Sequence, residues 1–469
     1  MWVRGIVAAM VAMSGCAAGE RPVESGPRRA VVWNDCGDGF ECGRLSVPLD
    51  HGDPGGERLY LSLVRLPATG RRIGSLVINP GGPGGSGVEY ARSAPAHFSA
   101  AVRGRFDIVG FDPRGVGESA PIDCLSDERL TTFHAIDTTP DTGAERRAYE
   151  RAARGFADAC QERSARLLPH MSTIDSARDL DLLREALGDA KLTYLGKSYG
   201  TFLGALYADM YPGKVRALVL DGGVDPSMSR LRHNAEQAEG FERAFRAYAA
   251  DCRTQGECPV GSVEALTGLL RRTDRVPLTS DGGRPVTEAL ATLGALTPLY
   301  DRSSWPALTQ ALRAARSGDG TRLLENAESL IGRTSDGTYT NQTEAAMATT
   351  CLDGPHPRDP SAYAAPPTTP FGPYISWSAL PCAYWPAPPR PIRPLRGQGA
   401  PPILVIGTTR DPATPHPWAR SLANQLASGT LLTYDADGHT AYGGTSPCVD
   451  RYVDTYLISL TAPSDGSTC

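Results

Sequence analysis

Three features that mark other classes of protein are missing from this sequence of 469 residues. The apolar stretch from Gly5 to Met13 falls well short of the roughly 20 residues that a membrane-spanning helix needs. The formal net charge is −5, which gives no reason to expect a nucleic acid as partner. No two of the 11 cysteines form a C-x-x-C motif, so a zinc site is not expected.

The composition that remains is that of a loop-rich globular protein. With 51 glycines and 39 prolines the chain must contain many loops, while a hydrophobic content of 41% is enough for a real core. The length exceeds one typical domain and suits a core of roughly 250 to 300 residues that carries an insertion.

The N-terminus has the pattern of an export signal. Arg4 supplies a positive charge ahead of the apolar stretch. Met13-Ser14-Gly15-Cys16 resembles a lipobox, in which the cysteine is acylated and becomes the mature N-terminus. We therefore expect a signal peptide at residues 1–15, a tether at residues 16–30 and a lipid anchor that holds the protein at the outer face of the cytoplasmic membrane. The alternative is a secreted protein cleaved near Ala17-Ala18-Gly19.

The ten cysteines that follow Cys16 form an even set. In an exported protein an even number suggests disulfides, here five, although the sequence alone does not fix their connectivity. We expect pairs that are local in sequence, namely Cys36–Cys42, Cys124–Cys160, Cys252–Cys258, Cys351–Cys382 and Cys448–Cys469.

The most informative motif is Gly196-Lys197-Ser198-Tyr199-Gly200. It follows an apolar, strand-like run at residues 192–195 and precedes a helix-favouring stretch at residues 201–210. A serine between two glycines at a strand-to-helix turn is typical of the nucleophile elbow of the α/β-hydrolases, because larger side chains at the glycine positions would collide with the neighbouring strand and helix. We expect Ser198 to be the catalytic nucleophile. The alternative is a solvated serine at an ordinary turn.

The acid and the histidine of a catalytic triad should follow this serine in that order. Asp411 comes directly after a strand-like run, and His439 lies in a loop after the next such run, so we expect these residues to complete the triad. Asp435 and Asp437 are rival acids, but they lie too close in sequence to the histidine to reach behind its ring. His416 is the rival base, and its position just after the acid argues against it.

A glycine-rich loop at residues 79–87 should provide the oxyanion hole. It reads Asn-Pro-Gly-Gly-Pro-Gly-Gly-Ser-Gly and follows a strand-like run. Glycines let backbone amides approach a developing oxyanion closely. One donor would be the N–H of Tyr199, the residue after the nucleophile, and the other an N–H of this loop. A flexible linker or a phosphate-binding loop is the alternative, but the lysine that a phosphate loop requires does not follow.

Strand-like and helical segments alternate over most of the chain, which favours a mostly parallel sheet with helices on both faces. From residue 226 to residue 394 the strand signal stops and amphipathic helical patterns take its place. We expect the first part of an α/β-hydrolase core at residues 31–225, a helical lid at residues 226–394 and the C-terminal part of the core at residues 395–469. Ser176 should cap a helix over residues 176–187.

Together these motifs resemble the secreted tripeptidyl aminopeptidase and proline iminopeptidase branch of the α/β-hydrolases, whose members are serine exopeptidases. The resemblance covers nearly all of the mature chain and also includes residues 42–50, 110–119, 220–226 and 407–415. It implies that no metal and no cofactor take part. The triad and the oxyanion donors that it implies are Ser198, Asp411, His439, Gly82 and Tyr199. Pro80 stands where iminopeptidases usually carry histidine, so the tripeptidyl aminopeptidases match better.

Asp112 and Arg114, which follow a strand-like run, invite a catalytic interpretation. We expect a structural role instead, as a buried polar pair that braces the turn after the strand.

The sequence leaves the substrate open between peptides and esters, because a serine triad cleaves both. An aminopeptidase must bind a free α-ammonium group, for which lid carboxylates are the obvious means. Glu236, Glu239 and Glu242 fall three apart on one expected helix, and Asp225 and Asp353 are further candidates. A solvated acidic helix face is the alternative. We expect an exported aminopeptidase that acts on peptides, with a carboxylesterase of the same fold as the other possibility.

Overall fold

The computed structural model describes residues 30–256, 258–364 and 369–469. The expected signal peptide and the anchor residue Cys16 lie outside the described residues and stay predictions. Within these three ranges, every helix is too short or too polar to cross a membrane.

One sheet forms the centre of the protein. Its strands in the described residues are β1 (Asn34–Asp35), β2 (Glu41–Pro48), β3 (Arg58–Leu66), β4 (Gly74–Asn79), β5 (Phe106–Phe111), β6 (Leu192–Lys197), β7 (Val215–Asp221), β8 (Ile403–Arg410), β9 (Gly429–Asp437) and β10 (Ser467–Thr468). Their order is β1-β2-β3-β5-β4-β6-β7-β8-β9-β10. β1, β2 and β3 form an antiparallel edge, and every pair from β5–β4 to β9–β10 is parallel.

The composition of the central strands explains their place. β4 reads Gly-Ser-Leu-Val-Ile-Asn and β5 reads Phe-Asp-Ile-Val-Gly-Phe, and all of their residues are buried. Strands that are covered on both faces read as nearly continuous apolar runs. Successive side chains alternate between the faces, so that Val77 joins one hydrophobic cluster while Leu76 and Ile78 join the other.

Helices cover both faces of this sheet. α6, α7 and α15 pack in the cluster that holds Val77, and α1, α2, α3 and α16 pack in the cluster on the opposite face. The helices of the core are α1 (Gly87–Arg92), α2 (Ala94–His97), α3 (Ala100–Arg103), α4 (Asp127–Ala135), α5 (Gly143–Ser164), α6 (Thr173–Ala186), α7 (Tyr199–Met210), α15 (His416–Gln425) and α16 (Pro447–Ser459). The parallel sheet with helices on both faces confirms the expected α/β-hydrolase fold class.

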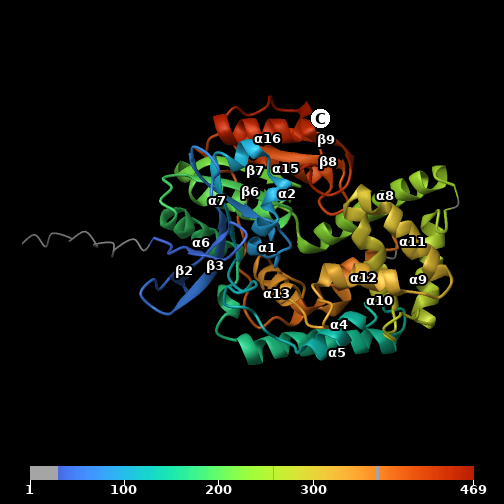
Figure 1. Cartoon of the computed structure of the whole chain (residues 1–469). Helices are drawn as coiled ribbons and strands as arrows, with labels where there is room; N and C mark the ends of the chain where they lie inside the picture. The colour runs from blue at the N-terminus through green and yellow to red at the C-terminus, as the bar shows by residue number, and fades with distance from the viewer. Residues whose placement is uncertain (1–29, 257, 365–368) are drawn as a thin grey trace, which may run out of the picture.

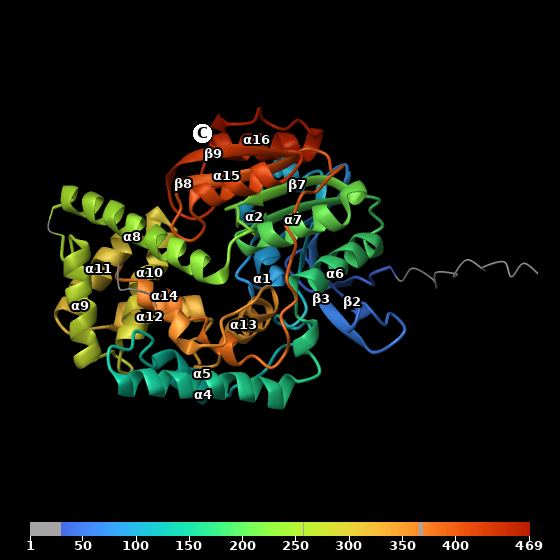
Figure 2. The same ribbon diagram turned by 180° about the vertical axis from the view of Figure 1, so that it is seen from behind.

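Between β7 and β8 the described chain is mainly helical. Its helices are α8 (Arg230–Thr254), α9 (Val263–Arg275), α10 (Glu288–Leu296), α11 (Trp305–Arg316), α12 (Thr321–Ile331), α13 (Gln342–Leu352) and α14 (Gly372–Trp377). Figures 1 and 2 show α8 to α12 gathered beside the sheet, with the long α5 running beneath both parts. α8 to α12 and α14 share a hydrophobic cluster of their own.

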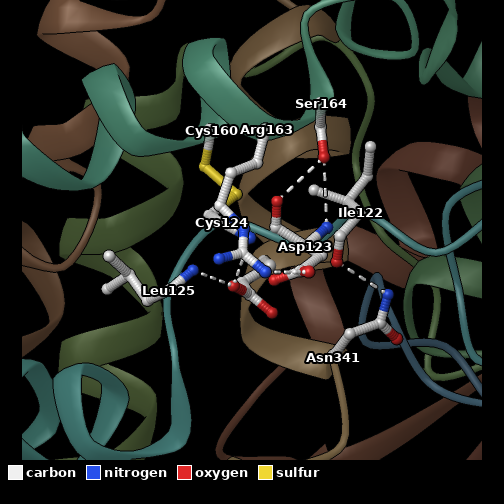
Figure 3. Close-up of a disulfide and its surroundings, with 9 residues drawn as sticks. Ile122, Asp123, Cys124, Leu125, Cys160, Arg163, Ser164 and Asn341 are labelled. Carbon is white, nitrogen blue, oxygen red and sulfur yellow. Dashed lines mark hydrogen bonds and ion pairs between the residues drawn. A yellow bond between two sulfur atoms is a disulfide. The ribbon is translucent and has the colours of Figure 1, made fainter.

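α13 is different, because its buried side chains belong to the cluster of the sheet. Asn341, at its N-terminus, donates an N–H to the carbonyl oxygen of Ile122 at 3.1 Å. Glu344 accepts the backbone N–H of Leu125 at 2.9 Å. Figure 3 shows Asn341 and Leu125 beside the Cys124–Cys160 disulfide, which ties the same segment to α5. α13 is therefore fixed to the core.

The structure confirms all five expected disulfides. Five disulfides are typical of proteins that work outside the cytoplasm. The bonds are Cys36–Cys42, Cys124–Cys160, Cys252–Cys258, Cys351–Cys382 and Cys448–Cys469.

The predicted start of α6 is wrong. The helix begins at Thr173, and its N-cap is Ser172, whose Oγ accepts the N–H of Asp175 at 3.3 Å. Ser176 lies inside the helix and is buried. Both serines are of a residue type that favours the N-cap, but Ser172 has the extended backbone, with φ −75° and ψ 154°, that this position requires.

The expected pairing of Asp112 with Arg114 is also wrong, although both are 2% exposed. Arg114 donates to the two carboxylate oxygens of Asp179 at 2.6 and 2.7 Å. Asp112 instead accepts the hydroxyl of Ser86 at 2.6 Å and the N–H of Val88 at 3.2 Å. Each residue therefore stabilises a different segment. The sequence did not predict this arrangement, because the partner of the arginine is 65 positions away and leaves no local signal.

Candidate active site

Ser198 occupies a strained turn between β6 and α7. Its backbone has φ 54° and ψ −124°, a conformation that is costly for a residue with a side chain. A Cβ on Gly196 would lie 2.3 Å from the carbonyl oxygen of Gly200, and a Cβ on Gly200 would lie 2.8 Å from Oδ1 of Asn79. Glycine is therefore required on both sides of the serine, as in a nucleophile elbow.

The imidazole of His439 contacts the carboxylate of Asp411. Nδ1 of the ring lies 2.9 Å from each carboxylate oxygen. Asp411 is 2% exposed, and Oδ1 also accepts the N–H groups of Ala413 and Thr414 at 2.9 and 2.8 Å. Because backbone donors fix the acid, it can hold the tautomer whose proton is on Nδ1, which leaves Nε2 available as a base.

The rival acids and the rival base have other partners. Asp435 and Asp437 each accept a hydrogen bond from Arg410, at 2.8 and 2.7 Å. Nε2 of His416 lies 3.0 Å from Oγ1 of Thr433. These contacts favour Asp411 and His439 over the alternatives that the sequence left open.

The end of β7 is bound both to the nucleophile elbow and to the loop that carries the histidine. The carbonyl oxygen of Asp221 accepts the N–H of Ser198 at 2.8 Å. Its carboxylate accepts the N–H of Ala441, two residues after His439, at 3.0 Å. The next residue, Gly222, has φ 74°, and a Cβ there would lie 3.2 Å from Cε1 of His439. Asp221 and Gly222 therefore lie against both the nucleophile elbow and the histidine loop.

The glycine-rich loop packs against the elbow. Gly81 has φ 99°, and a Cβ there would lie 2.9 Å from Cβ of Ser198 and 3.1 Å from the backbone nitrogen of Tyr199. Tyr199 is the first residue of α7, so its N–H has no acceptor within the helix. The next loop residue, Gly82, has φ 108°. The N–H groups of Gly82 and Tyr199 are those that a loop and an elbow of this kind offer to an oxyanion.

Comparison with known proteins agrees with this geometry. A family model described as "TAP-like protein" matches residues 367–469. The serine protease Hip1 of Mycobacterium tuberculosis is 39% identical over 92% of this chain and 87% of its own. Carboxylesterase B of the same organism is 36% identical over 93% and 89%. The tripeptidyl aminopeptidase of Streptomyces coelicolor is 33% identical over 94% and 86%. The chain belongs to the tripeptidyl aminopeptidase-like branch of the α/β-hydrolases. It is a serine hydrolase.

Solved structures resemble this hydrolase more distantly. Rv0554 from Mycobacterium tuberculosis is 16% identical with a TM-score of 0.40, over 88% of this chain and 97% of that one. The proline iminopeptidase of Mycobacterium smegmatis is 13% identical with a TM-score of 0.34, over 88% and 97%. The family assignment therefore depends on the sequence relatives.

The three glutamates that were candidates for binding the substrate ammonium group form ion pairs within their own helix. Glu236, Glu239 and Glu242 each form an ion pair with an arginine one helical turn away. Glu236 also accepts the indole N–H of Trp418 at 2.5 Å. Asp225 is buried, but hydrogen bonds, first among them those from Ser227, lower its pKa. These contacts fit an internally paired helix face better than a site for a substrate ammonium group.

Asp353, just after α13, is placed differently. Its carboxylate accepts the N–H and the hydroxyl of Thr173 at 2.8 and 2.5 Å, and the same hydroxyl lies 2.6 Å from that of Tyr199. Burial raises the pKa of Asp353 to about 7, although the hydrogen bonds from Thr173 and the charge of Arg230 lower it. The residue as a whole is partly exposed. A single threonine therefore links this lid carboxylate to the nucleophile elbow.

Sequence reasoning missed the contributions of Asp221 and Thr173. A signal for Asp221 is present, since it is a carboxylate at the end of an otherwise apolar strand and precedes two glycines. Thr173 leaves none, because its two partners are 26 and 180 positions away.

Proposed function

We propose that this serine hydrolase is an exported aminopeptidase that releases a short peptide or a single residue from free N-termini. Ser198 is the nucleophile, His439 the general base and Asp411 the acid that orients it. The observation that carries the proposal is the contact of Nδ1 of His439 with both carboxylate oxygens of Asp411, at 2.9 Å, at the same end of the parallel strands as the strained turn of Ser198. Relatives named serine protease and tripeptidyl aminopeptidase support a peptide as substrate.

In the first half of the reaction, Oγ of Ser198 attacks the scissile carbonyl carbon while Nε2 of His439 takes its proton. The carbonyl electron pair moves to the oxygen, where the N–H groups of Gly82 and Tyr199 stabilise the negative charge. The tetrahedral intermediate then expels the amine, which receives the proton from His439, and an acyl-enzyme remains. In the second half, His439 deprotonates a water molecule that attacks the acyl-enzyme, and the proton then passes from His439 to Oγ of Ser198 as the carboxylic acid product leaves.

Asp353 is the proposed partner of the substrate α-ammonium group. Its carboxylate accepts the hydroxyl of Thr173, which also contacts the hydroxyl of Tyr199, a proposed oxyanion donor through its backbone N–H. An ammonium group at Asp353 would therefore be held relative to the scissile carbonyl through one connected network. Glu236, Glu239 and Glu242 are weaker candidates, because each is already neutralised by an arginine.

Three substrates test the proposal, namely a tripeptide anilide with a free amino group, its N-acetylated form and a short acyl ester. An ammonium paired with a partly desolvated carboxylate contributes roughly 1.5 to 3 kcal/mol, so acetylation should lower kcat/KM by about 10- to 100-fold. Asp353→Asn should abolish this preference and spare the ester, whereas Asp359→Asn, an exposed carboxylate nearby, should change neither rate.

The pH dependence of the same comparison follows from the raised pKa of Asp353. Only the carboxylate form of Asp353 attracts an ammonium group. Because the pKa is about 7, the fraction of Asp353 in this form increases as the pH rises through neutrality. The preference for the free amine over the acetylated peptide should therefore increase between pH 6 and pH 7 in the wild type, but not in Asp353→Asn. Above that range the substrate α-amino group, with a pKa of about 7.7 to 8.0, loses its own charge, and the increase should stop.

A carboxylesterase is the second candidate, because a relative of that name is 36% identical. Equal rates on the free and acetylated peptides, together with faster cleavage of the ester, would contradict the proposed aminopeptidase activity and support a carboxylesterase.

We also propose that Cys16 is acylated and holds the enzyme at the outer face of the cytoplasmic membrane. The lipobox-like Met13-Ser14-Gly15-Cys16 and the five disulfides of the mature part support export and anchoring. Mass spectrometry of the mature N-terminus should find a diacylated cysteine. An unmodified N-terminus that begins beyond Cys16 would instead show a secreted form.

A further inference from the structure

Two side chains of opposite charge, the buried Asp221 and the half-buried Lys197, bind the segment that follows the proposed catalytic His439. Asp221 is 0% exposed, and its carboxylate accepts the N–H of Ala441 at 3.0 Å and the N–H of Tyr442 at 2.9 Å. Lys197, the residue before the nucleophile, donates from Nζ to the carbonyl oxygen of Tyr442 at 2.7 Å. Three backbone groups of the segment that follows His439 are thus bound by two charged side chains.

The main chain of Asp221 binds the other half of the site. Its carbonyl oxygen accepts the N–H of Ser198 at 2.8 Å, while its side chain holds the segment after His439. One residue therefore fixes the distance between the elbow and the histidine loop. Buried charges are costly unless they are paired and hydrogen-bonded, so an apolar strand end would be the cheaper way to stabilise the sheet.

The hydrogen bonds of Asp221 fit a carboxylate. Burial raises the pKa of Asp221 above its usual range, and the charge of Lys197, the two backbone N–H groups and the charge of His439 reduce this shift. Both carboxylate oxygens accept N–H groups, which a protonated carboxyl would do less well. The further charged or titratable groups around this cluster include Tyr90 and Asp450, which both act on Lys197, and Asp411, which contacts Nδ1 of the imidazole. The ring of Tyr300 also packs against that of His439, with the ring centres 5.4 Å apart.

We propose that Asp221 and Lys197 are positioning residues of the hydrolase: they fix the loop that carries His439 and set the charge around its imidazole. The inference depends on the role proposed above for His439. A negative charge at Asp221 stabilises the imidazolium that forms when Ser198 loses its proton. The positive charge of Lys197 opposes it. Removal of the two charges should therefore change the stability of this imidazolium in opposite directions.

The test compares Asp221→Asn and Lys197→Met in the full chain with its disulfides intact. A short acyl ester is the probe, because its hydrolysis does not involve the proposed ammonium site. A small displacement of a catalytic group costs up to about 100-fold, so we expect Asp221→Asn to lower kcat by roughly 10- to 100-fold with KM nearly unchanged. The acid limb of kcat/KM should move down by roughly half a pH unit in Asp221→Asn and up in Lys197→Met.

Asp107→Asn is the matched control, since Asp107 is also a buried strand carboxylate, 7% exposed, that accepts a backbone N–H and pairs with Arg72. It lies near the start of β5, at the end of the sheet away from the site. The control should lose stability without a change in the acid limb.

An Asp221→Asn enzyme with the wild-type kcat and acid limb would overturn the inference, and so would a loss of activity that only follows the folded fraction. If Asp221→Asn does not fold, Lys197→Met decides: an acid limb that rises supports the inference, and one that stays in place contradicts it. Failure of the proposed function is seen separately, as ester hydrolysis that survives Ser198→Ala.

Discussion

At the scale of single residues, the negative charge of Asp411 should have a large effect on kcat, second only to the reacting groups of Ser198 and His439. Asp411→Asn keeps the size of the side chain but lets an amide stabilise the wrong tautomer of His439. We expect kcat to fall by about 10³ to 10⁴, with little change in melting temperature. Steady-state kinetics on the acyl ester measure this loss.

Asp435→Asn and Asp437→Asn are the controls for that experiment, because both aspartates pair with Arg410 rather than with the imidazole. Each should cost far less than Asp411→Asn. If either variant is crippled while Asp411→Asn remains active, the acid has been assigned to the wrong residue.

At the scale of elements, α13 forms a wall against the glycine-rich loop. Gly84 has φ 92°, and a Cβ there would lie 2.4 Å from the carbonyl oxygen of Gln342 and 3.0 Å from the nitrogen of Ala346. Gly84→Ala should therefore push the loop and α13 apart. We expect a loss of roughly 1 to 3 kcal/mol of stability and a fall in kcat of about tenfold, because the loop carries a proposed oxyanion donor.

Gly155→Ala in α5 is the matched control for Gly84→Ala. A Cβ at Gly155 meets nothing within 4 Å, and the residue is helical, so alanine should raise stability by about 0.5 to 1 kcal/mol and leave kcat unchanged. Thermal unfolding and ester kinetics on both variants give the answer. Wild-type activity in Gly84→Ala would show that α13 does not restrain the loop.

A second contact between elements joins α10 to the segment before α5. Carboxylate oxygens of Asp137, Asp274 and Glu288 lie within 4.8 Å of one another. Burial raises the pKa of Glu288 to about 7, and the charges of Asp137 and Asp274 add to the shift, against the hydrogen bond from Thr139. The folded state therefore favours the protonated form of Glu288.

The sign of the pH effect on stability follows from that shift. The pKa of Glu288 is higher in the folded than in the unfolded protein, so its protonated form stabilises the fold at low pH, and this contribution is lost between about pH 4.5 and pH 7. Glu288→Gln cannot lose it. The free energy of unfolding of the variant relative to that of the wild type should therefore be higher at pH 8 than at pH 5. After allowance for solvent screening, we expect this difference to be about 1 to 2 kcal/mol. Denaturant unfolding at both pH values, with the exposed Glu325→Gln as control, measures the difference.

At the scale of the whole molecule, the sequence predicts what local patterns encode. The elbow around Ser198, the order of acid and histidine, and the alternation of strands and helices all follow from short motifs and periodicity. The disulfides were predictable because their partners are 6 to 36 positions apart. Asp179 as the partner of Arg114, and Asp353 as the partner of Thr173, depend on how distant segments pack, which no local pattern records.

The lid shows the same limit on a larger scale. The helical pattern of residues 226–394 does not reveal that α13 packs with the sheet while α8 to α12 pack with one another. Nor does it reveal that the lid contacts the site, where the carbonyl oxygen of Tyr300 accepts the N–H of His439 at 2.7 Å. A residue of this insertion thus contacts the proposed active site.

The most direct test of the account is the turnover of Ser198→Ala. The substitution removes the proposed nucleophile at the elbow and leaves the disulfides and the core unchanged. The account predicts a folded protein whose hydrolysis of both the tripeptide anilide and the acyl ester falls by about 10⁶-fold, to the level left by binding and the oxyanion hole. Near wild-type turnover of either substrate by a clean preparation of Ser198→Ala would contradict it.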